Sequence, residues 1–198
     1  MDSIIIRAGK ENDAEFLAQT VMNALGEALC NNLAGGRENL PKVKALFTHL
    51  ARIPSSQYSY KNSFVAEEGD TPVGAIIAYD GARLHELRKA FVVGANRYLR
   101  WNVSIEEADE WDDEATPDEI YLDSLFVVPA YRNQGIATRL ITRVREHYGE
   151  SHKPLGLLAE PENKDAISLY QHLGFRKIDI SHFFRTPMIH MQRHCQTI

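Results

Sequence analysis

Residues 125–138 place the features of an anion-binding site at the start of a predicted helix. The segment runs Leu-Phe-Val-Val-Pro-Ala-Tyr-Arg-Asn-Gln-Gly-Ile-Ala-Thr: a strand stops at Pro129, a loop follows, and a helix begins at Gly135. Backbone amides in such a loop and first helical turn have no partners within the helix, and the helix dipole adds about half a positive charge. Gly135 and Ala137 are small enough to let a phosphate approach these amides, and Arg132 adds a positive charge. The segment therefore predicts a site for a phosphate-bearing ligand.

Two familiar phosphate motifs do not fit this loop. It lacks the Gly-Lys-Ser/Thr ending of a P-loop, and it has a single glycine, unlike a dinucleotide-binding loop. The same residues also fit an ordinary joint between a strand and a helix. The loop alone leaves both interpretations open, a phosphate site and a structural joint.

A second motif further along the chain completes a resemblance to a known family. Asn163 opens a predicted helix, Ala166 follows in its first turn, and the sequence Leu-Tyr-Gln-His-Leu-Gly-Phe closes it at residues 169–175. The earlier motif fits Gln/Arg-x-x-Gly-x-Gly/Ala over residues 132–137, after a strand of the type Leu-x-Val-x-Pro. Together the two blocks resemble the acyl-CoA-binding motifs of the GNAT superfamily of N-acetyltransferases. The predicted order of strands and helices also agrees with that family, so the resemblance covers most of the chain.

The resemblance implies acetyl-CoA as cosubstrate and a place for each of its parts. The amides of residues 132–138 would hold the pyrophosphate, and the strand backbone at 126–128 would pair with the pantetheine arm. Asn163 would bond to that arm, and the Val127 amide would polarise the thioester carbonyl. The implied acyl-CoA-binding residues are Phe126, Val127, Val128, Arg132, Asn133, Gln134, Gly135, Ile136, Ala137, Thr138, Asn163 and Ala166.

The resemblance also places Tyr170 near the thioester sulfur, where it would act as a general acid. We expect its phenol, with a pKa of about 10 against roughly 8.5 for a thiol, to protonate the leaving thiolate. The acceptor amine needs a base, and strand alternation predicts Glu119, Asp123 and Val127 on one face of residues 119–128. Asp123 is therefore the first candidate for the base and Glu119 the second. Alternatively, these acids only bind a cationic group, and Tyr170 is a core residue.

Most of the acidic residues near the middle of the chain fall in one run. Without this run basic residues outnumber acidic ones, so the net charge of −5 has a local origin. Such a patch argues against nucleic acid or an anionic membrane as partner, and it suits a cationic substrate. The competing interpretation is a solvated loop that only aids solubility. The run spans residues 106–119 and contains Glu106, Glu107, Asp109, Glu110, Asp112, Asp113, Glu114, Asp118 and Glu119.

Histidines and aromatic residues give two further signals. His190 and His194 are four residues apart with His182 nearby, which on a helix could suit zinc. Their segment reads as a strand, so we expect no metal site, and His190 is instead a candidate for lining the acceptor cleft. Four aromatic residues near predicted gaps between elements would either shape an acceptor pocket or pack in the core. They are Tyr58, Tyr60, Trp101 and Trp111.

The predicted elements alternate between strands and helices. We expect an α/β (α+β) fold with a GNAT-like mixed, mostly antiparallel sheet of six to seven strands, flanked by helices and splayed near Val127. Asn12 or Asp13 would cap a first helix that is broken at residues 31–36. Residues 81–118 begin like a helix and are expected to be an insertion, unlike the family, within a single domain over residues 1–198. Expected strands are 3–8, 63–67, 72–79, 119–128, 155–159, 175–180 and 185–192, and the other expected helices are 38–51, 135–148 and 163–173.

Composition narrows the cellular setting. The chain has 198 residues, of which 44% are apolar and 25% charged, as in ordinary globular domains. Two cysteines, Cys30 and Cys195, cannot form a disulfide framework. No apolar run approaches the roughly 20 residues of a membrane span, and the N-terminus does not read as a signal peptide. We therefore expect a reduced, cytoplasmic protein that has no membrane partner.

Taken together, these features predict transfer of acetyl from acetyl-CoA to an amine. The acceptor would be a primary amine of a small cationic molecule or of a peptide or protein. The main alternative is a non-catalytic acyl-CoA-binding regulatory module on the same fold. A binding domain outside this family, whose loop fits by chance, is a further alternative. The C-terminal strands offer an edge through which a homodimer could form.

Overall fold

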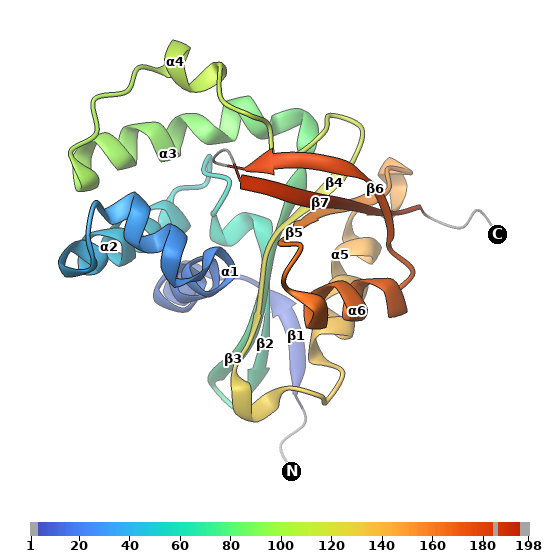
Figure 1. Ribbon diagram of the computed structural model, residues 1–198. Coiled ribbons are helices and arrows are strands. Elements are labelled where there is room, and N and C mark those ends of the chain that lie inside the picture. The colour runs from blue at the N-terminus through green and yellow to red at the C-terminus, as the bar shows by residue number, and fades with distance from the viewer. Residues whose placement is uncertain (1–3, 184–185, 195–198) are drawn as a thin grey trace.

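The computed structural model describes residues 4–183 and 186–194 and contains one mixed sheet (Figure 1). The strand order is β1-β2-β3-β4-β5-β7-β6, and all neighbours are antiparallel except β4 and β5. This confirms the predicted mixed, mostly antiparallel sheet. Two predicted strand residues, Ser3 and Arg185, lie outside the described residues. The strands are β1 (Ile5–Ala8), β2 (Ser63–Glu68), β3 (Thr71–Asp80), β4 (Ile120–Val127), β5 (Leu155–Ala159), β6 (Arg176–Phe183) and β7 (Thr186–Arg193).

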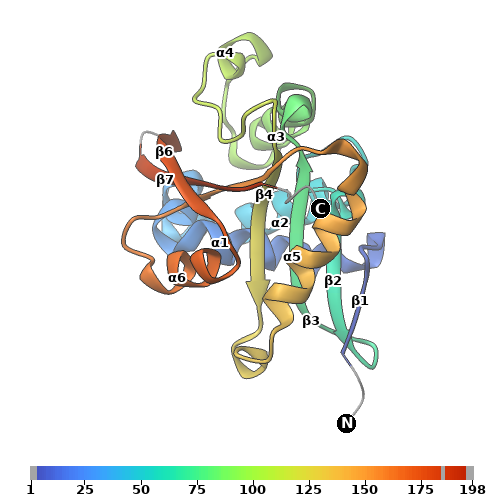
Figure 2. The same ribbon diagram turned by 90° about the vertical axis from the view of Figure 1, so that its right-hand side faces the viewer.

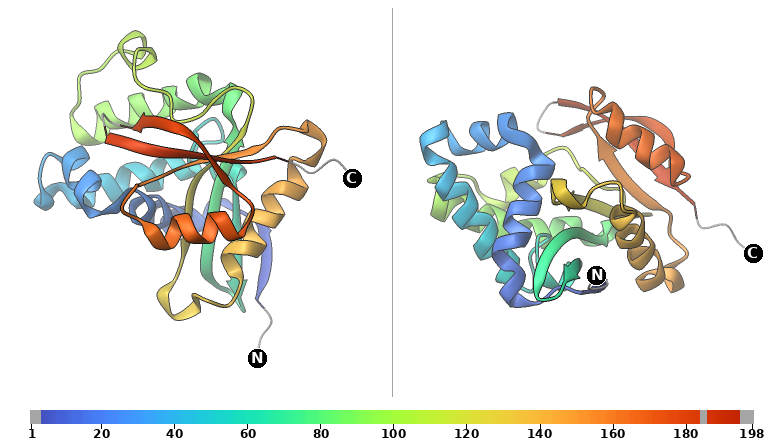
Figure 3. Two further views of the ribbon diagram at one scale, coloured as in Figure 1. Left: turned by 45° about the vertical axis from the view of Figure 1, so that its right-hand side comes forward. Right: turned by 90° about the horizontal axis from the view of Figure 1, so that it is seen from below.

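Helices cover both faces of this sheet (Figures 1 and 3). On one face, α1, α2 and α3 share a core with inward side chains of β2 and β3, among them Val65 and Ile77. On the other face, α5 packs on residues such as Ile76 and Ala78, as the alternation of strand side chains requires. The α-helices are α1 (Ala14–Ala34), α2 (Leu40–Arg52), α3 (Leu84–Leu99), α4 (Ile105–Asp109), α5 (Ile136–His147) and α6 (Lys164–His172). Short 3-10 turns cover Glu11–Asp13, Arg37–Asn39, Tyr60–Asn62, Gly81–Arg83, Pro129–Tyr131 and Gly149–Ser151.

The sheet splits between its two parallel strands. Strands β4 and β5 pair only at Ile120 with Leu155 and at Tyr121 with Gly156. Beyond Tyr121 the strands separate, which is visible where β4 and the β5–β7 group diverge in Figure 2. The splay therefore begins well before the predicted Val127. From residue 122 onward the backbone of β4 has no strand partner on the β5 side, and there the Val127 carbonyl accepts a hydrogen bond from the Arg132 side chain at 3.2 Å.

A β-bulge on β4 changes which face its side chains occupy. Asp123 has no partner on β3, because Leu122 and Ser124 oppose consecutive residues of that strand. A bulge reverses the alternation beyond it. Leu122 and Val127 therefore both pack toward α5, whereas Asp123 approaches Tyr79 on the opposite side, with 3.5 Å between carboxylate and hydroxyl. The prediction that Asp123 and Val127 share one face of the strand is wrong for this reason.

Helix α1 also differs from its prediction in two ways. Its backbone leaves helical geometry at Gly26, with φ 76° and ψ 165°, a conformation that glycine adopts at little cost. The helix then continues to Ala34 and ends at the left-handed Gly35. Of the two predicted cap residues, Asp13 occupies the N-cap position of α1, but its side chain does not cap the helix, because its carboxylate binds Arg7 at 2.7 Å and the Lys10 amide at 2.7 Å instead.

Candidate functional site

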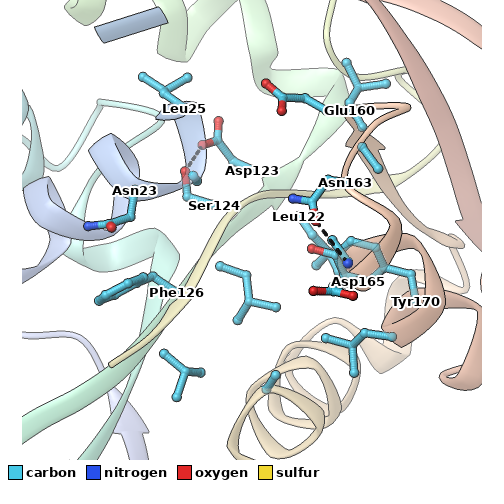
Figure 4. Close-up of a pocket in the computed structure, with 18 of the residues that line it drawn as sticks. Asn23, Leu25, Leu122, Asp123, Ser124, Phe126, Glu160, Asn163, Asp165 and Tyr170 are labelled. Atoms are coloured by element: carbon cyan, nitrogen blue, oxygen red, sulfur yellow. Dashed lines mark hydrogen bonds between the residues drawn. The ribbon is translucent and has the colours of Figure 1, made fainter. Parts of the chain in front are cut away.

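A cavity of about 1080 Å³ follows the open backbone of β4. In Figure 4, Asn23 of α1 lies on one side of this strand and Asn163 and Tyr170 lie on the other. Asp123, Ser124 and Phe126 project from the strand between them. The split sheet thus creates a cleft between the α1 half and the α6 half of the protein.

One end of this cavity is formed by backbone amides at the start of α5. The loop before the helix contains two left-handed residues, Asn133 with φ 61° and Gly135 with φ 74°. The amide of Arg139 donates to the Gly135 carbonyl at 3.0 Å, so the amides of residues 136–138 precede the helical hydrogen bonds. Residues 136–138 all line the cavity. The predicted helix start at Gly135 is confirmed, and the geometry suits an anion such as a diphosphate.

Most of the residues implied for acyl-CoA binding line this cavity. The exceptions are Val128, whose amide donates to the Val73 carbonyl, and Gln134, whose side chain donates to the Ala130 carbonyl. Asn163 caps α6 as predicted, since its side-chain oxygen accepts from the Ala166 amide at 3.1 Å. The cavity is lined by Phe126, Val127, Arg132, Asn133, Gly135, Ile136, Ala137, Thr138, Asn163 and Ala166.

Tyr170 enters the cavity from α6. Its ring packs against Phe175, with centroids 5.7 Å apart. Burial raises the pKa of its hydroxyl to about 12. The phenol is therefore protonated at neutral pH, but complete proton transfer to a thiolate would be uphill, because a thiol has a pKa of roughly 8.5. This position suits a hydrogen-bond donor to a developing thiolate more than the full proton donor that the sequence predicts.

Asp123 lies on the α1 side of the same cavity. Burial raises the pKa of its carboxyl to about 7, and the nearby charge of Glu114 acts in the same direction. A hydrogen bond from the Ser124 hydroxyl at 2.7 Å opposes part of this shift. A carboxylate with a pKa near 7 has the proton affinity that a general base needs at neutral pH.

Glu119 lies outside the cavity, although strand alternation predicts it on the same face of the strand as Asp123. Its carboxylate is fully buried and accepts hydrogen bonds from the Thr116 amide (2.9 Å), the His190 ring (2.9 Å) and the Gln192 side chain (2.7 Å). Burial alone would raise the pKa of Glu119, but these hydrogen bonds lower it. Glu119 and His190 do not line the cavity along β4. They join β7 to the start of β4, and the structure does not bring them to the site.

The acidic run is divided among several structural roles. Glu114 points inward, is buried, and pairs with Arg88 of α3 at 2.7 Å. Asp113 also binds Arg88, at 2.9 Å, and His85 bridges Asp109 and Asp113. The run is therefore not one open patch, because several of its acids hold the loop onto α3. Glu106, Glu110, Asp112 and Asp118 have exposed side chains.

A second cavity, of about 460 Å³, adjoins the first on the α3 side. The two share Tyr58, Glu114 and Phe183 in their linings. Three of the four predicted acceptor aromatics line the second cavity, while Tyr60 packs against the core of α1 and α2. Other lining residues escaped the sequence analysis because no local pattern marks them. They are Gln57, which lies in a loop, and Phe91, whose helical spacing is typical of a core residue.

Within residues 4–183 and 186–194, no group of three or more His, Cys, Asp or Glu side chains is arranged to hold a metal ion. None of the helices in those ranges combines the length and apolarity needed to cross a bilayer. Cys30 is buried, and Cys195 lies outside the described residues.

Two curated proteins are similar to this chain over short stretches. Mouse thialysine N-epsilon-acetyltransferase is 41% identical over 58 residues, which cover 28% of this chain and 33% of the mouse protein. The Arabidopsis thaliana N-alpha-acetyltransferase MAK3 is 39% identical over 70 residues, which cover 34% of this chain and 37% of the plant protein. The matched part thus spans about a third of the length of each relative.

Solved structures and a family model extend this similarity over the chain. A Staphylococcus aureus N-acetyltransferase superposes with a TM-score of 0.73 at 21% identity, covering 95% of this chain and 99% of that one. Another acetyltransferase structure gives a TM-score of 0.72 at 20% identity, covering 96% and 98%. These likenesses show a shared fold. The family model described as acetyltransferase (GNAT) family matches residues 41–175, and the chain belongs to that family.

Proposed function

We propose that this protein transfers the acetyl group of acetyl-CoA to a primary amine of a small cationic molecule or of a peptide or protein. One observation carries the proposal: the amides at the start of α5, the open backbone of β4, Tyr170 and Asp123 line a single cavity. The relatives support it, because one is named for acetyl transfer to an ε-amine and the other for transfer to an α-amine.

The acetyl-CoA molecule would lie along the open backbone of β4. Its diphosphate fits the amides of residues 136–138, with the Arg132 side chain at the rim. Its pantetheine arm fits the stretch of β4 that has no β5 neighbour, where backbone groups are open to an added strand-like partner. Asn163 and Ala166 face this stretch from α6. The thioester would then lie between Tyr170 and the Val127 backbone.

The proposed chemistry is direct attack by the amine. The amine nitrogen forms a bond with the thioester carbonyl carbon, and the carbon–sulfur bond breaks to release CoA thiolate. Asp123 accepts the proton that the amine loses, directly or through a water molecule. Tyr170 donates a hydrogen bond to the departing sulfur, and solvent completes the protonation of the thiolate.

Three further proposals concern the cellular location, the domain organisation and the oligomeric state. A cytoplasmic, reduced environment fits a chain with two cysteines, one of them buried without a disulfide. A single domain with residues 81–118 as an insertion fits the packing of Phe91 and Ala95 in the core of α1 and α2. A homodimer would use β6, the edge strand of the sheet, on which Ile178 and Ile180 are exposed.

Thiol release with a panel of primary amines tests this function. The full chain is incubated with acetyl-CoA and each amine, and both free CoA and the acetylated amine are quantified. We expect the two products to appear in equal amounts and only when protein is present. Saturable acetyl-CoA binding without acetylated product from any small amine or peptide would instead favour the non-catalytic acyl-CoA-binding module.

A further inference from the structure

The second cavity has an aromatic lining that is built from distant parts of the chain. Tyr58, Phe91, Trp101 and Trp111 surround it, and we call it the aromatic chamber. The centroid of the Trp101 ring lies 6.3 Å from that of Trp111 and 5.9 Å from that of Phe91, and both contacts have edge-to-face geometry. Its volume of about 460 Å³ falls within the range of roughly 300–1,000 Å³ that is typical of small-ligand sites.

A buried hydrogen-bond acceptor in the chamber wall has no partner. Gln57 is 3% exposed, and its side-chain nitrogen donates to the Glu114 carboxylate at 3.1 Å. The same amide also hydrogen-bonds to Asp123. Two carboxylates therefore fix the orientation of the amide, and its oxygen is left without a partner among the described residues. A buried carbonyl oxygen without a hydrogen-bond donor is destabilising, and an N–H or O–H group of a ligand would satisfy it.

The charges around the chamber favour a cation. Its lining contains Arg88 and three acids, Glu110, Asp112 and Glu114. The Arg88 guanidinium is already bound by Glu114, Asp113 and the backbone carbonyls of Ala108 and Asp112. Glu110 and Asp112 are exposed, so their negative charges reach the solvent side of the chamber. Aromatic ring faces attract cations as well, and tryptophan does so most strongly.

We infer that the aromatic chamber binds a second positively charged nitrogen of the acceptor, so that preferred acceptors are primary amines that carry another cationic group. The inference rests on the proposed acetyl transfer for its identification of the acceptor. Gln57 contacts Asp123, and the two cavities share Tyr58 and Glu114, so one molecule can reach from the proposed base into the chamber. The reacting amine would lie at Asp123, and the second nitrogen would lie in the chamber, beside the Trp101 and Trp111 rings.

Intrinsic fluorescence tests the chamber without acetyl-CoA or turnover. The chain has only two tryptophans, Trp101 and Trp111, and both line the chamber. The full chain is titrated with choline and, separately, with dimethylbutanol, the neutral isostere in which carbon replaces the charged nitrogen. We expect a saturable change with choline, and about tenfold weaker binding of the isostere. Equal affinities, or no saturable change with choline, would overturn the inference.

Charge-neutral variants separate the chamber from the rest of the acidic run. Glu110→Gln with Asp112→Asn should weaken choline binding by about two- to fivefold and leave the isostere unaffected. Both side chains are exposed, so folding should not suffer. The matched control is Glu106→Gln with Asp118→Asn, which removes the same charge from the same run outside the chamber. Equal weakening by both pairs would show a general charge effect and contradict the inference.

Turnover then distinguishes failure of the inference from failure of the proposed function. We expect kcat/KM for an alkyl diamine to exceed that for the monoamine of equal chain length by about tenfold. Trp101→Leu should remove this preference while acetyl-CoA affinity stays unchanged. Equal turnover of diamine and monoamine would refute the chamber's role but keep the acetyl transfer. Choline binding without any turnover would keep the cation site and refute the transfer.

Discussion

The part of the cleft that we propose for acetyl-CoA, the donor half, and the part that we propose for the amine, the acceptor half, are built in different ways. The donor half comes from two continuous segments, residues 125–138 and 163–175, and offers mainly backbone groups: an open strand and the amides of a helix start. The acceptor half combines α1, the loop around Gln57, α3 and the acidic run, and offers mainly side chains. The two halves meet at Asp123 on β4.

This difference explains why sequence motifs identify only one half. Backbone groups can bind a ligand only where local geometry is right, so small residues and a helix start must recur in a fixed order. Side chains can be replaced one at a time, and their partners lie far apart in sequence. Gln57 and Glu114, for example, are separated by 57 positions yet form a buried hydrogen bond. Such a pair leaves no local pattern.

The largest expected effect is a loss of acetyl-CoA affinity, caused by a substitution in the donor half alone. Ala137→Glu places a carboxylate among the amides at the start of α5, where the diphosphate is expected. We expect acetyl-CoA affinity to fall by about a thousandfold, because juxtaposed like charges cost several kcal/mol. Calorimetric titration measures the loss. Thr142→Glu, further along the same helix and outside the cavity, is the control and should bind normally. If both variants bind equally well, the amides do not hold the diphosphate.

The next effect concerns the stability of the acceptor half. Arg88→Met removes the partner of Glu114, and both side chains are at least 94% buried. We expect the free energy of unfolding to fall by about 3 kcal/mol, because an unpaired charge is left in the interior. Urea unfolding measures this change, and adding Glu114→Gln should recover part of it. If the double variant is no more stable than Arg88→Met, the ion pair does not anchor the acidic run.

Removing the Tyr170 hydroxyl should slow the proposed acetyl transfer. Tyr170→Phe should lower kcat by about a hundredfold while acetyl-CoA affinity is kept, because the departing sulfur loses a hydrogen-bond donor. Steady-state kinetics and calorimetry separate the two quantities. Tyr148→Phe is the matched control, since the Tyr148 hydroxyl donates to the Ala78 carbonyl away from the cavity. Normal turnover in the Tyr170 variant would remove this residue from the chemistry.

The smallest expected effect is a change in pH dependence. Since Asp123 has a pKa of about 7, the wild-type rate should rise through that pH as the carboxylate forms. Asp123→Asn should abolish the rise and cost about tenfold near pH 8, because part of the amine can lose its proton to water. A pH profile of kcat/KM with a normal rise in the variant would exclude Asp123 as the base.

Asp123→Asn should lower the reaction rate but should not lower the stability of the protein near pH 8. The folded pKa of Asp123 lies above its usual 3.8, so this group destabilises the fold as pH rises from about 4 to about 7. Asp123→Asn should therefore be at least as stable as the wild type near pH 8. Urea unfolding at low and at neutral pH checks this, and a less stable variant at high pH would contradict the raised pKa.

Strands and helices were predictable where the signal is local. The β-branched runs and the glycine at the start of α5 gave element bounds close to those of β3, β5 and α5. The break of α1 at Gly26 was missed, because one glycine in an amphipathic pattern does not reveal its own φ. The bulge at Asp123 was missed because it depends on pairing with β3, and that error put Asp123 and Val127 on one face.

The candidate site was also predictable only where the sequence signal is local. The loop and the α6 motif led to most of the residues that line the cavity, including Tyr170 and Asn163. Glu119 was the second candidate for the base, but its partners His190 and Gln192 lie more than 70 positions away and hold it outside the cavity. The sequence predicts the acidic run as one patch, because charge counts do not show which acids turn inward to meet Arg88.

Calorimetric titration of the full chain with acetyl-CoA, with no acceptor present, tests the central claim most directly. The claim is that backbone groups of β4 and α5 form a donor site that is complete without the acceptor half. It predicts saturable binding of one acetyl-CoA per chain with micromolar affinity. Absence of binding at millimolar acetyl-CoA would contradict it, because the amides at the start of α5 would then not be a working diphosphate site.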